Sequence, residues 1–253
     1  GPSCNNMTDL LSLNGKRALV TGASSGLGPI IATALDAAGA SVGIHYHQNL
    51  EGAESLAATL TNPTTLLQAD LSQSESVASL FEAAAPVNIL VNCAAAESQN
   101  VEDLDKLDSE RWRNTQQTNV EAPLVLIQKL AKQSSAAAVI NISSIEGRRP
   151  APGHGHYSTS KAALEMLTKS AALEFGPIGL RVNAIAPGLI WRDGIEEGWP
   201  EGVKAWNAAA PLGRLVQPDD IASAVVFLSS DAAASITGIV LTIDCGLSIK
   251  PGW

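Results

Sequence analysis

Short apolar runs alternate along the chain with longer stretches in which apolar residues recur at helical spacing. The short runs have strand length and cover residues 17–21, 41–46, 65–69, 88–92, 138–142, 180–185 and 239–243. Helical patterns fill the intervals at residues 27–38, 50–60, 74–84, 110–133, 157–175 and 218–229. Strict alternation of the two kinds of element predicts an α/β fold, a doubly wound parallel sheet of about seven strands with helices on both faces.

The pattern contains no repeat and no linker, so residues 13–253 are expected to form one domain. Residues 1–12 are expected to be a flexible tail, with Gly1-Pro2 a remnant of tag removal and Met7 the natural start. A chain of 253 residues buries roughly 70–75% of its extended surface on folding, which needs no disulfide or metal for support.

Charge and cysteine usage exclude several classes of protein. The formal net charge of −9 argues against nucleic acid and anionic membranes as partners, because both need basic patches. The three cysteines, Cys4, Cys93 and Cys245, are too scattered for a disulfide framework, and no cysteine or histidine cluster has zinc spacing. With no signal peptide and no apolar run long enough for a membrane helix, a cytoplasmic protein without a metal is expected.

A glycine-rich turn follows the first predicted strand. Gly22, Gly26 and Gly28 lie between this strand and the first helix, where glycines let the backbone turn tightly and approach a pyrophosphate. The N-terminus of the helix offers unpaired N–H groups and a partial positive charge. An acidic protein can therefore hold a dinucleotide through local dipoles.

Tyr157 and Lys161 are four residues apart in a predicted helix, so their side chains lie on one face. Ser144 lies thirteen positions before the tyrosine, at the end of a predicted strand. A free tyrosine, with a pKa of about 10, is a poor acid or base at neutral pH. A cation about 4 Å away contributes about 4 kcal/mol at an effective dielectric constant near 20, which lowers the phenol pKa by up to roughly 3 before desolvation offsets part of it.

These three signals together resemble the short-chain dehydrogenase/reductase family, from about residue 16 to residue 249. The resemblance implies a Rossmann-type fold and an NAD(P)(H)-dependent oxidoreductase, such as a carbonyl reductase, that interconverts a ketone and a secondary alcohol. It assigns Tyr157 as the general acid and base and Lys161 as its cationic neighbour. Ser144 would hold the substrate oxygen, and Asn119 would hold a water in a proton relay to the lysine.

The same resemblance implies a set of residues that contact the cofactor. The set is Gly22, Ser24, Ser25, Gly26, Leu27, Gly28, His47, Asp70, Leu71, Asn92, Ala94, Tyr157, Lys161, Pro187, Gly188, Ile190 and Arg192. No acid stands between Asp36 and Glu51, where an NAD enzyme places one on the ribose. NADP(H) is therefore favoured, and NAD(H) stays open. Cys93 is expected to be a small packed residue and not a nucleophile.

Three tryptophans lie where the family has its mobile substrate lid, here about residues 191–210. Trp191, Trp199 and Trp206 supply large stacking surfaces, which would suit a bulky or planar apolar substrate held with Ser144 and Tyr157. Packing of the lid onto the body of the protein is the alternative for these indoles.

Other functions stay open at this point. Residues 44–47, 51–60 and 170–174 resemble pteridine reductases, which reduce a C=N bond, but those enzymes tend to have an aspartate where Ser144 stands. A 3-oxoacyl-thioester reductase would need a basic patch for an acidic carrier protein, and Arg148-Arg149 is the candidate pair. A dinucleotide-sensing regulator on the same fold is disfavoured, because Tyr157 and Lys161 are both present.

The resemblance also implies assembly. Relatives bury the helices that correspond to residues 110–133 and 157–175 in a dimer interface and pair two dimers through the last strand. A homotetramer, or a homodimer, acting on a small carbonyl or alcohol is expected.

Overall fold

The computed structural model describes residues 6–133 and 135–249. Within these residues all the strands are parallel and lie side by side in the order β3-β2-β1-β4-β5-β6-β7. Their bounds are β1 (Arg17–Val20), β2 (Ser41–Tyr46), β3 (Thr64–Gln68), β4 (Ile89–Asn92), β5 (Ala137–Ile142), β6 (Leu180–Pro187) and β7 (Val240–Ile243). The predicted Rossmann-type sheet is confirmed, and each strand lies within two residues of its predicted position.

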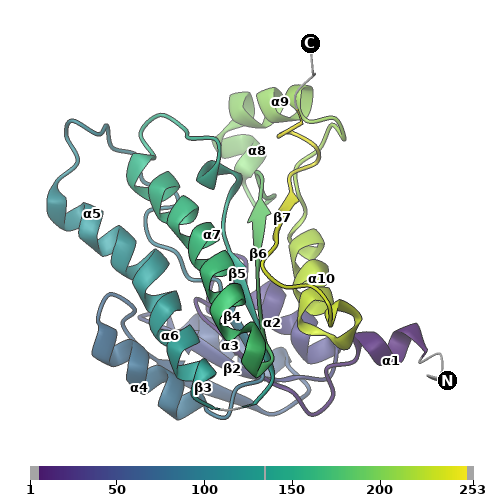
Figure 1. Cartoon of the computed structure of the whole chain (residues 1–253). Helices are drawn as coiled ribbons and strands as arrows, with labels where there is room; N and C mark the ends of the chain where they lie inside the picture. The colour runs from purple at the N-terminus through teal and green to yellow at the C-terminus, as the bar shows by residue number, and fades with distance from the viewer. Residues whose placement is uncertain (1–5, 134, 250–253) are drawn as a thin grey trace.

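Helices cover both faces of the sheet (Figure 1). On one face, α2 (Gly28–Ala37), α3 (Leu50–Thr59) and α10 (Pro218–Ser229) pack in one apolar core. On the other face, α4 (Ser74–Ala84), α6 (Ala122–Ala131) and α7 (Gly155–Phe175) pack in a second core. Every residue of β4 and β5 is buried, because the central strands of a parallel sheet are covered on both sides.

The long helix predicted at residues 110–133 is interrupted. It consists of α5 (Ser109–Gln116), a π-helical turn η1 (Gln117–Glu121) and α6. Pro123 lacks the N–H group that an α-helix would donate to the carbonyl of Asn119, so a regular helix cannot continue through this point. Single π-turns of this kind are frequent at functional sites, and this one contains Asn119.

Part of the segment expected to be a flexible tail is ordered. Residues Met7–Leu11 form the short helix α1, whose first turn is capped by the Asn6 side chain. Leu13 is fully buried, and its N–H donates to the carbonyl of Ala38 at 2.8 Å. Burial of this leucine attaches the segment to the body of the protein, which the expectation for residues 6–12 missed. Gly1-Pro2 and the rest of residues 1–5 lie outside the described residues.

The lid region also contains structure that the pattern did not predict, namely α8 (Ile195–Gly198) and α9 (Pro200–Ala209). Short 3₁₀ turns complete the described chain at η2 (Ile145–Gly147), η3 (Gly176–Ile178) and η4 (Asp231–Ala233). In the described parts of the chain, no helix has the length and apolar character needed to cross a bilayer.

Candidate active site

The predicted site residues lie together at the carboxyl edge of the sheet, which is the edge formed by the carboxyl ends of its strands. The strand order reverses between β1 and β4, which makes this edge the topological switch point where α/β proteins bind ligands. The glycine-rich turn follows β1, Ser144 follows β5, and residues 187–190 follow the body of β6.

The glycine-rich turn has the shape of a pyrophosphate cradle. Gly22 and Gly26 have φ angles of +63° and +64°, a conformation that other residues rarely adopt. A Cβ on Gly28 would overlap the carbonyl oxygen of Gly22, whereas the space above Gly26 is open. Leu27 makes no side-chain cap, which leaves the first N–H groups of α2 for a ligand. The turn therefore fits a dinucleotide.

His45 holds this turn in place, a role that the sequence did not suggest. Its Nδ1 accepts a hydrogen bond from the N–H of Gly22 at 2.9 Å, so the ring proton must lie on Nε2, which is 3.0 Å from the Ala69 carbonyl oxygen. The side chain is 2% exposed, and burial lowers its pKa. A neutral imidazole of fixed tautomer thus connects the glycine-rich turn to the end of β3.

The residues expected at the adenosine end lie close together. His47 Nε2 is 3.9 Å from Asp70 Oδ2, and both side chains are largely exposed. The other carboxylate oxygen of Asp70 accepts from the N–H and hydroxyl of Ser72, which lowers the Asp70 pKa. Leu71 is buried beside them. Asp36, the nearest upstream acid, is bound to Thr61 and Asn62 and faces away from this end.

The expected catalytic residues come together beneath this edge. Lys161 is 2% exposed, and its Nζ donates to the carbonyl of Ile142 at 2.8 Å and lies 5.5 Å from the centre of the Tyr157 ring. Ser144 Oγ accepts from the N–H of Glu146 at 3.1 Å. Because that contact uses only a lone pair, the Ser144 hydroxyl proton can donate to the neighbouring Tyr157 oxygen or to a substrate oxygen.

Asn119 connects two parts of the site. Its side chain accepts from the N–H of Ala96 at 2.7 Å and donates to the Ala96 carbonyl and to Ser160 Oγ. Ser160 in turn donates to the carbonyl of Tyr157 at 2.6 Å. Both amide protons of Asn119 are therefore used, and the side chain fixes the loop after β4 against the catalytic helix α7.

Next to this loop, Glu97 has a φ angle of +68° and receives hydrogen bonds from Arg111 on α5 and from His156, the residue before Tyr157. Burial alone would raise the Glu97 pKa, but these two donors and their charges hold it below its usual value. Nothing in the sequence pattern marked this cluster, because it joins three separate segments.

Burial controls the protonation of the catalytic pair in the ligand-free protein. Burial raises the pKa of the Tyr157 phenol, the Glu146 carboxylate raises it further, and the Ser144 hydroxyl works in the opposite direction. Burial also lowers the pKa of Lys161 from 10.5 to about 8. In the ligand-free protein, burial therefore outweighs any lowering of the Tyr157 pKa by Lys161. The expectation that Lys161 lowers the tyrosine pKa does not hold for this state.

The loop after β4 supplies two further facts. Asn92 donates to Asn141, but its own side-chain oxygen is buried without a partner among the described residues, as expected beside a site that a ligand completes. Ala94 lies against Gly22. Burial raises the pKa of the Cys93 thiol to about 11, so this cysteine stays protonated at neutral pH and is a poor nucleophile.

The three lid tryptophans do not share one role. Trp206 is 9% exposed, its Nε1 donates to the carbonyl of Arg214, and its ring fills the space beside Gly188. Trp199 is half exposed and packs on Gly202. Packing of the lid onto the body therefore accounts for Trp206, which offers no free surface to a substrate, whereas Trp199 packs within the lid and keeps an exposed face. Trp191 is 38% exposed.

The loop after β6 is held on both sides. The N–H of Gly188 donates to Ile243, and Ile190 forms a bridge with Val216. Arg192 is exposed, and no ion pair holds it among the described residues. It stays a candidate for contact with a phosphate or with the substrate.

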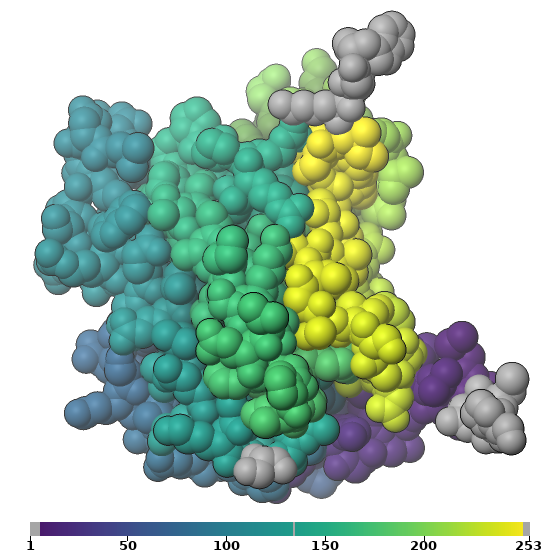
Figure 2. All heavy atoms as spheres, in the orientation of Figure 1, coloured from purple at the N-terminus to yellow at the C-terminus, as the bar shows by residue number. Residues whose placement is uncertain are grey.

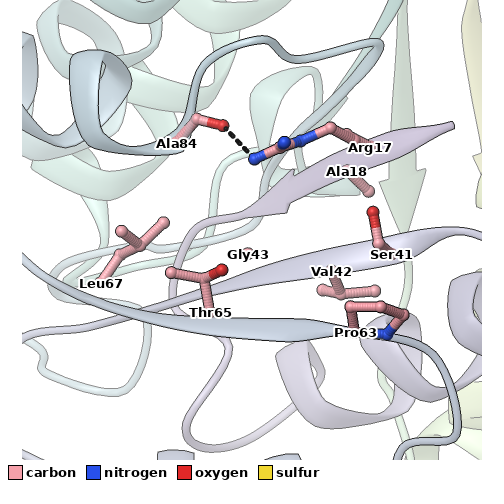
Figure 3. A pocket seen from close by; sticks show the side chains of 9 residues that line it. All are labelled: Arg17, Ala18, Ser41, Val42, Gly43, Pro63, Thr65, Leu67 and Ala84. Carbon is pink, nitrogen blue, oxygen red and sulfur yellow. Dashed lines mark hydrogen bonds between the residues drawn. The ribbon is translucent and has the colours of Figure 1, made fainter.

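A small cavity lies at the opposite edge of the sheet (Figure 3). Its volume is about 150 Å³, and Arg17, Ser41 and Thr65 line it near the amino ends of their strands, with Ala84 contributing from α4. Arg17 donates to the Ala84 carbonyl there. Because the expected catalytic residues lie at the carboxyl ends of the strands, this cavity is separate from the candidate site.

Comparison with known proteins gives a consistent result. Residues 22–248 match the family model described as enoyl-(acyl carrier protein) reductase. The chain is 34% identical to 3β-hydroxysteroid dehydrogenase 1 of Eggerthella lenta over 254 residues, which covers 95% of this chain and 97% of the relative.

Two solved structures are similar over almost the whole chain. One is 7α-hydroxysteroid dehydrogenase with NADH and a 7-oxo bile acid conjugate, with a TM-score of 0.88, 30% identity and coverage of 96% and 97% of the two chains. The other is gluconate 5-dehydrogenase of Burkholderia cenocepacia with NADP and tartrate, with a TM-score of 0.86, 26% identity and coverage of 96% and 99%.

Proposed function

The chain belongs to the short-chain dehydrogenase/reductase family and is an NAD(P)-dependent oxidoreductase that interconverts ketones and alcohols, and we propose that Tyr157 is its general acid and base. The observation that carries this proposal is the meeting of Ser144, Tyr157 and Lys161 at one edge of the sheet. When bound, the nicotinamide supplies or accepts the hydride. Ser144 donates a hydrogen bond to the carbonyl oxygen, and Tyr157 donates the proton that the developing alkoxide needs.

The protonation states support this role in reduction. A raised phenol pKa keeps Tyr157 in the acid form across neutral pH, ready to donate. Lys161 lies within reach to balance the charge once the proton has left, and its Nζ has further N–H groups besides the one that donates to Ile142. In the oxidation direction Tyr157 must act as a base, which its raised pKa disfavours in the ligand-free state.

The cofactor preference is proposed to be NADP(H). No acid lies between the end of β2 and Glu51 in the first turn of α3 to repel a 2′-phosphate, and Asp36 is bound to Thr61. His47, which is half exposed and lies 3.9 Å from Asp70, is the residue proposed to meet that phosphate. Titration with NADPH and NADH tests this proposal. The His47→Asp variant should lose affinity for NADPH and keep affinity for NADH, with His47→Asn as the uncharged control. Equal loss of both affinities would contradict the assignment.

The catalytic proposal is tested by turnover. The panel holds aromatic ketones, a dihydropteridine and a 3-oxoacyl thioester, with oxidation of NADPH as the signal. Tyr157→Phe should reduce kcat on a ketone by about 10²- to 10⁴-fold and change NADPH affinity far less than that. Thr159→Ala, an exposed hydroxyl on the same helix, is the matched control. Full activity of Tyr157→Phe, or turnover of the pteridine alone, would refute the proposal.

Charge disfavours the carrier-protein alternative. Arg148 donates to Glu165, and Arg149 donates to the carbonyl of Leu247, so the candidate docking pair is already engaged. The lid next to the site presents Glu196, Glu197 and Glu201 to solvent. An acidic carrier protein would meet like charge there.

We also propose that the protein assembles as a homotetramer. Met166 and Leu173 on α7 are 61% and 81% exposed in the single chain, and α7 and the C-terminal segment lie side by side on one face (Figure 2). Strand β7 is the last strand of the sheet, and no described strand pairs with its outer side. Light scattering on a sizing column tests the mass, and Leu173→Glu should reduce it. A wild-type monomer would contradict the proposal.

A further inference from the structure

Glu146 lies in the first turn after Ser144 and belongs to none of the roles described so far. It is the middle residue of η2, and its side chain is 21% exposed. Its Oε1 is 2.8 Å from Nδ1 of His154 and 3.5 Å from the hydroxyl of Ser158, both at the start of α7. These contacts hold the carboxylate between the end of β5 and the beginning of the catalytic helix.

This position places the carboxylate beside the reacting groups. The N–H of Glu146 donates to Ser144 Oγ, and the ring of His154 meets the Tyr157 ring edge-on with 6.1 Å between their centres. The charge of Glu146 also reaches the phenol, since it is the second cause of the raised Tyr157 pKa after burial. Glu146, Ser144 and Tyr157 therefore lie close together.

One oxygen of this carboxylate has no partner in the described chain. A carboxylate offers about four acceptor sites, yet both donors go to Oε1 and none to Oε2. Glu165, the next carboxylate on the same side of the sheet, differs in this respect. Ser143 donates to one of its oxygens and Arg148 to the other. Both oxygens of Glu165 thus accept hydrogen bonds from the protein, whereas Glu146 is partly buried and keeps one oxygen without a donor from the described chain.

A partly buried charge is stabilised by a donor that the substrate can bring. We infer that Glu146 Oε2 accepts a hydrogen bond from a hydroxyl on the carbon next to the reacting one, so that the substrates are α-hydroxy ketones and the corresponding vicinal diols. The inference rests on the proposed function, because Ser144 and Tyr157 must hold the reacting oxygen. A hydroxyl on the adjacent carbon stays close to these three side chains, and the carboxylate rejects a substrate that carries an anionic group there.

The test compares a matched pair of ketones that differ only in this hydroxyl. Acetophenone and its α-hydroxylated form, phenacyl alcohol, are assayed with NADPH. The ratio of their kcat/KM values is measured for the wild type, Glu146→Gln and Glu165→Gln. The parent ketone corrects for any effect on the Tyr157 pKa or on folding, because such effects act on both substrates. A structural role would leave the ratio unchanged.

Loss of a charged hydrogen bond should lower kcat/KM for phenacyl alcohol about tenfold in Glu146→Gln and change acetophenone less than about twofold. Glu165→Gln should leave the ratio at its wild-type value. An equal loss for both ketones in Glu146→Gln, or no change in either, overturns the inference and leaves the proposed function intact. Failure of the wild type to reduce any ketone overturns both this inference and the proposed function.

A second measurement needs no variant. Phenylethane-1,2-diol should inhibit the wild-type enzyme with a lower inhibition constant than 1-phenylethanol, both in competition with a ketone that the enzyme turns over. Equal inhibition constants, or tighter inhibition by the mono-alcohol, contradict the inference even if Glu146→Gln fails to fold.

Discussion

The buried lysine makes the stability of the protein depend on pH in a direction that can be measured. Lys161 holds its proton up to a pKa of about 8 when folded, against 10.5 as the reference value. Between these values the unfolded chain binds more protons than the folded one, so the free energy of unfolding rises with pH. Below about pH 8 both states bind the proton, and the full cost of burying the charge is present.

The size of the effect follows from the two pKa values. Applying linkage to 10.5 and about 8 gives a gain of about 2 kcal/mol from Lys161 between about pH 7 and about pH 9.5. Lys161→Met removes the titrating group, so the difference in unfolding free energy between wild type and variant should grow by this amount. Burial, and not a neighbouring charge, is the main cause, so the gain should survive in high salt.

Urea unfolding of the ligand-free protein, at one fixed protein concentration, measures the difference at the two pH values. Lys169→Met is the matched control, because Lys169 is exposed on the same helix and its loss should leave the pH dependence parallel to that of the wild type. Other groups that titrate alike in the wild type and in Lys161→Met cancel when their unfolding free energies are subtracted. A wild-type advantage over Lys161→Met that stays constant or shrinks with rising pH would refute the reasoning.

Three further predictions follow from other parts of the structure. Gly28→Ala should weaken dinucleotide binding at least about tenfold, because its Cβ would displace the Gly22 carbonyl. Nicotinamide fluorescence measures the affinity. Gly176→Ala is the control, because Gly176 has open space around it and the variant should bind as the wild type does. Asp36→Asn should lower the free energy of unfolding by about 1–3 kcal/mol at neutral pH, because Thr61 and Asn62 donate to the Asp36 carboxylate and hold its folded pKa below 3.8. This stability is lost only as pH falls through the folded pKa. If urea unfolding shows the same decline in stability at acid pH for the variant and the wild type, the prediction is wrong. Trp206→Phe should lower Tm, because the Arg214 carbonyl loses its donor at a cost of about 1 kcal/mol, and KM should not change; a raised KM with unchanged Tm would instead place Trp206 in contact with substrate.

The sequence predicted those features that depend on local pattern. Strands such as β4 and β5 are continuous apolar runs because both their faces are buried, and the glycines of the phosphate turn are needed for backbone angles that only they adopt easily. Tyr157, Lys161 and Ser144 could be assigned because their spacing matches a known family. The π-turn at Gln117–Glu121 left no pattern of its own except Pro123.

Features that depend on contacts between distant segments could not be predicted. His45 looks like any polar residue in a strand until the fold brings it to Gly22. Glu146 becomes informative only when His154 and Ser158 are seen to satisfy one of its oxygens. The sequence left substrate contact and lid packing open for Trp206, because a tryptophan in a lid gives the same pattern whether it faces the pocket or the core. The lowered pKa of Lys161 could not be read from the sequence, because the burial that causes it depends on the fold.

The order of the strands has a consequence for building sensors from this enzyme. Strands β1 to β4 come from the first part of the chain and carry the phosphate turn, whereas β5 to β7 come from the second part and carry Ser144, Tyr157 and Lys161. The two parts pair along β4 and β5, and the loop at residues 97–107 between them is mostly exposed. A chain divided in that loop gives fragments that each lack half of the site. Because the dinucleotide binds only the joined form, it favours reassociation by mass action. Reductase activity would then report the encounter of any two proteins to which the halves are fused.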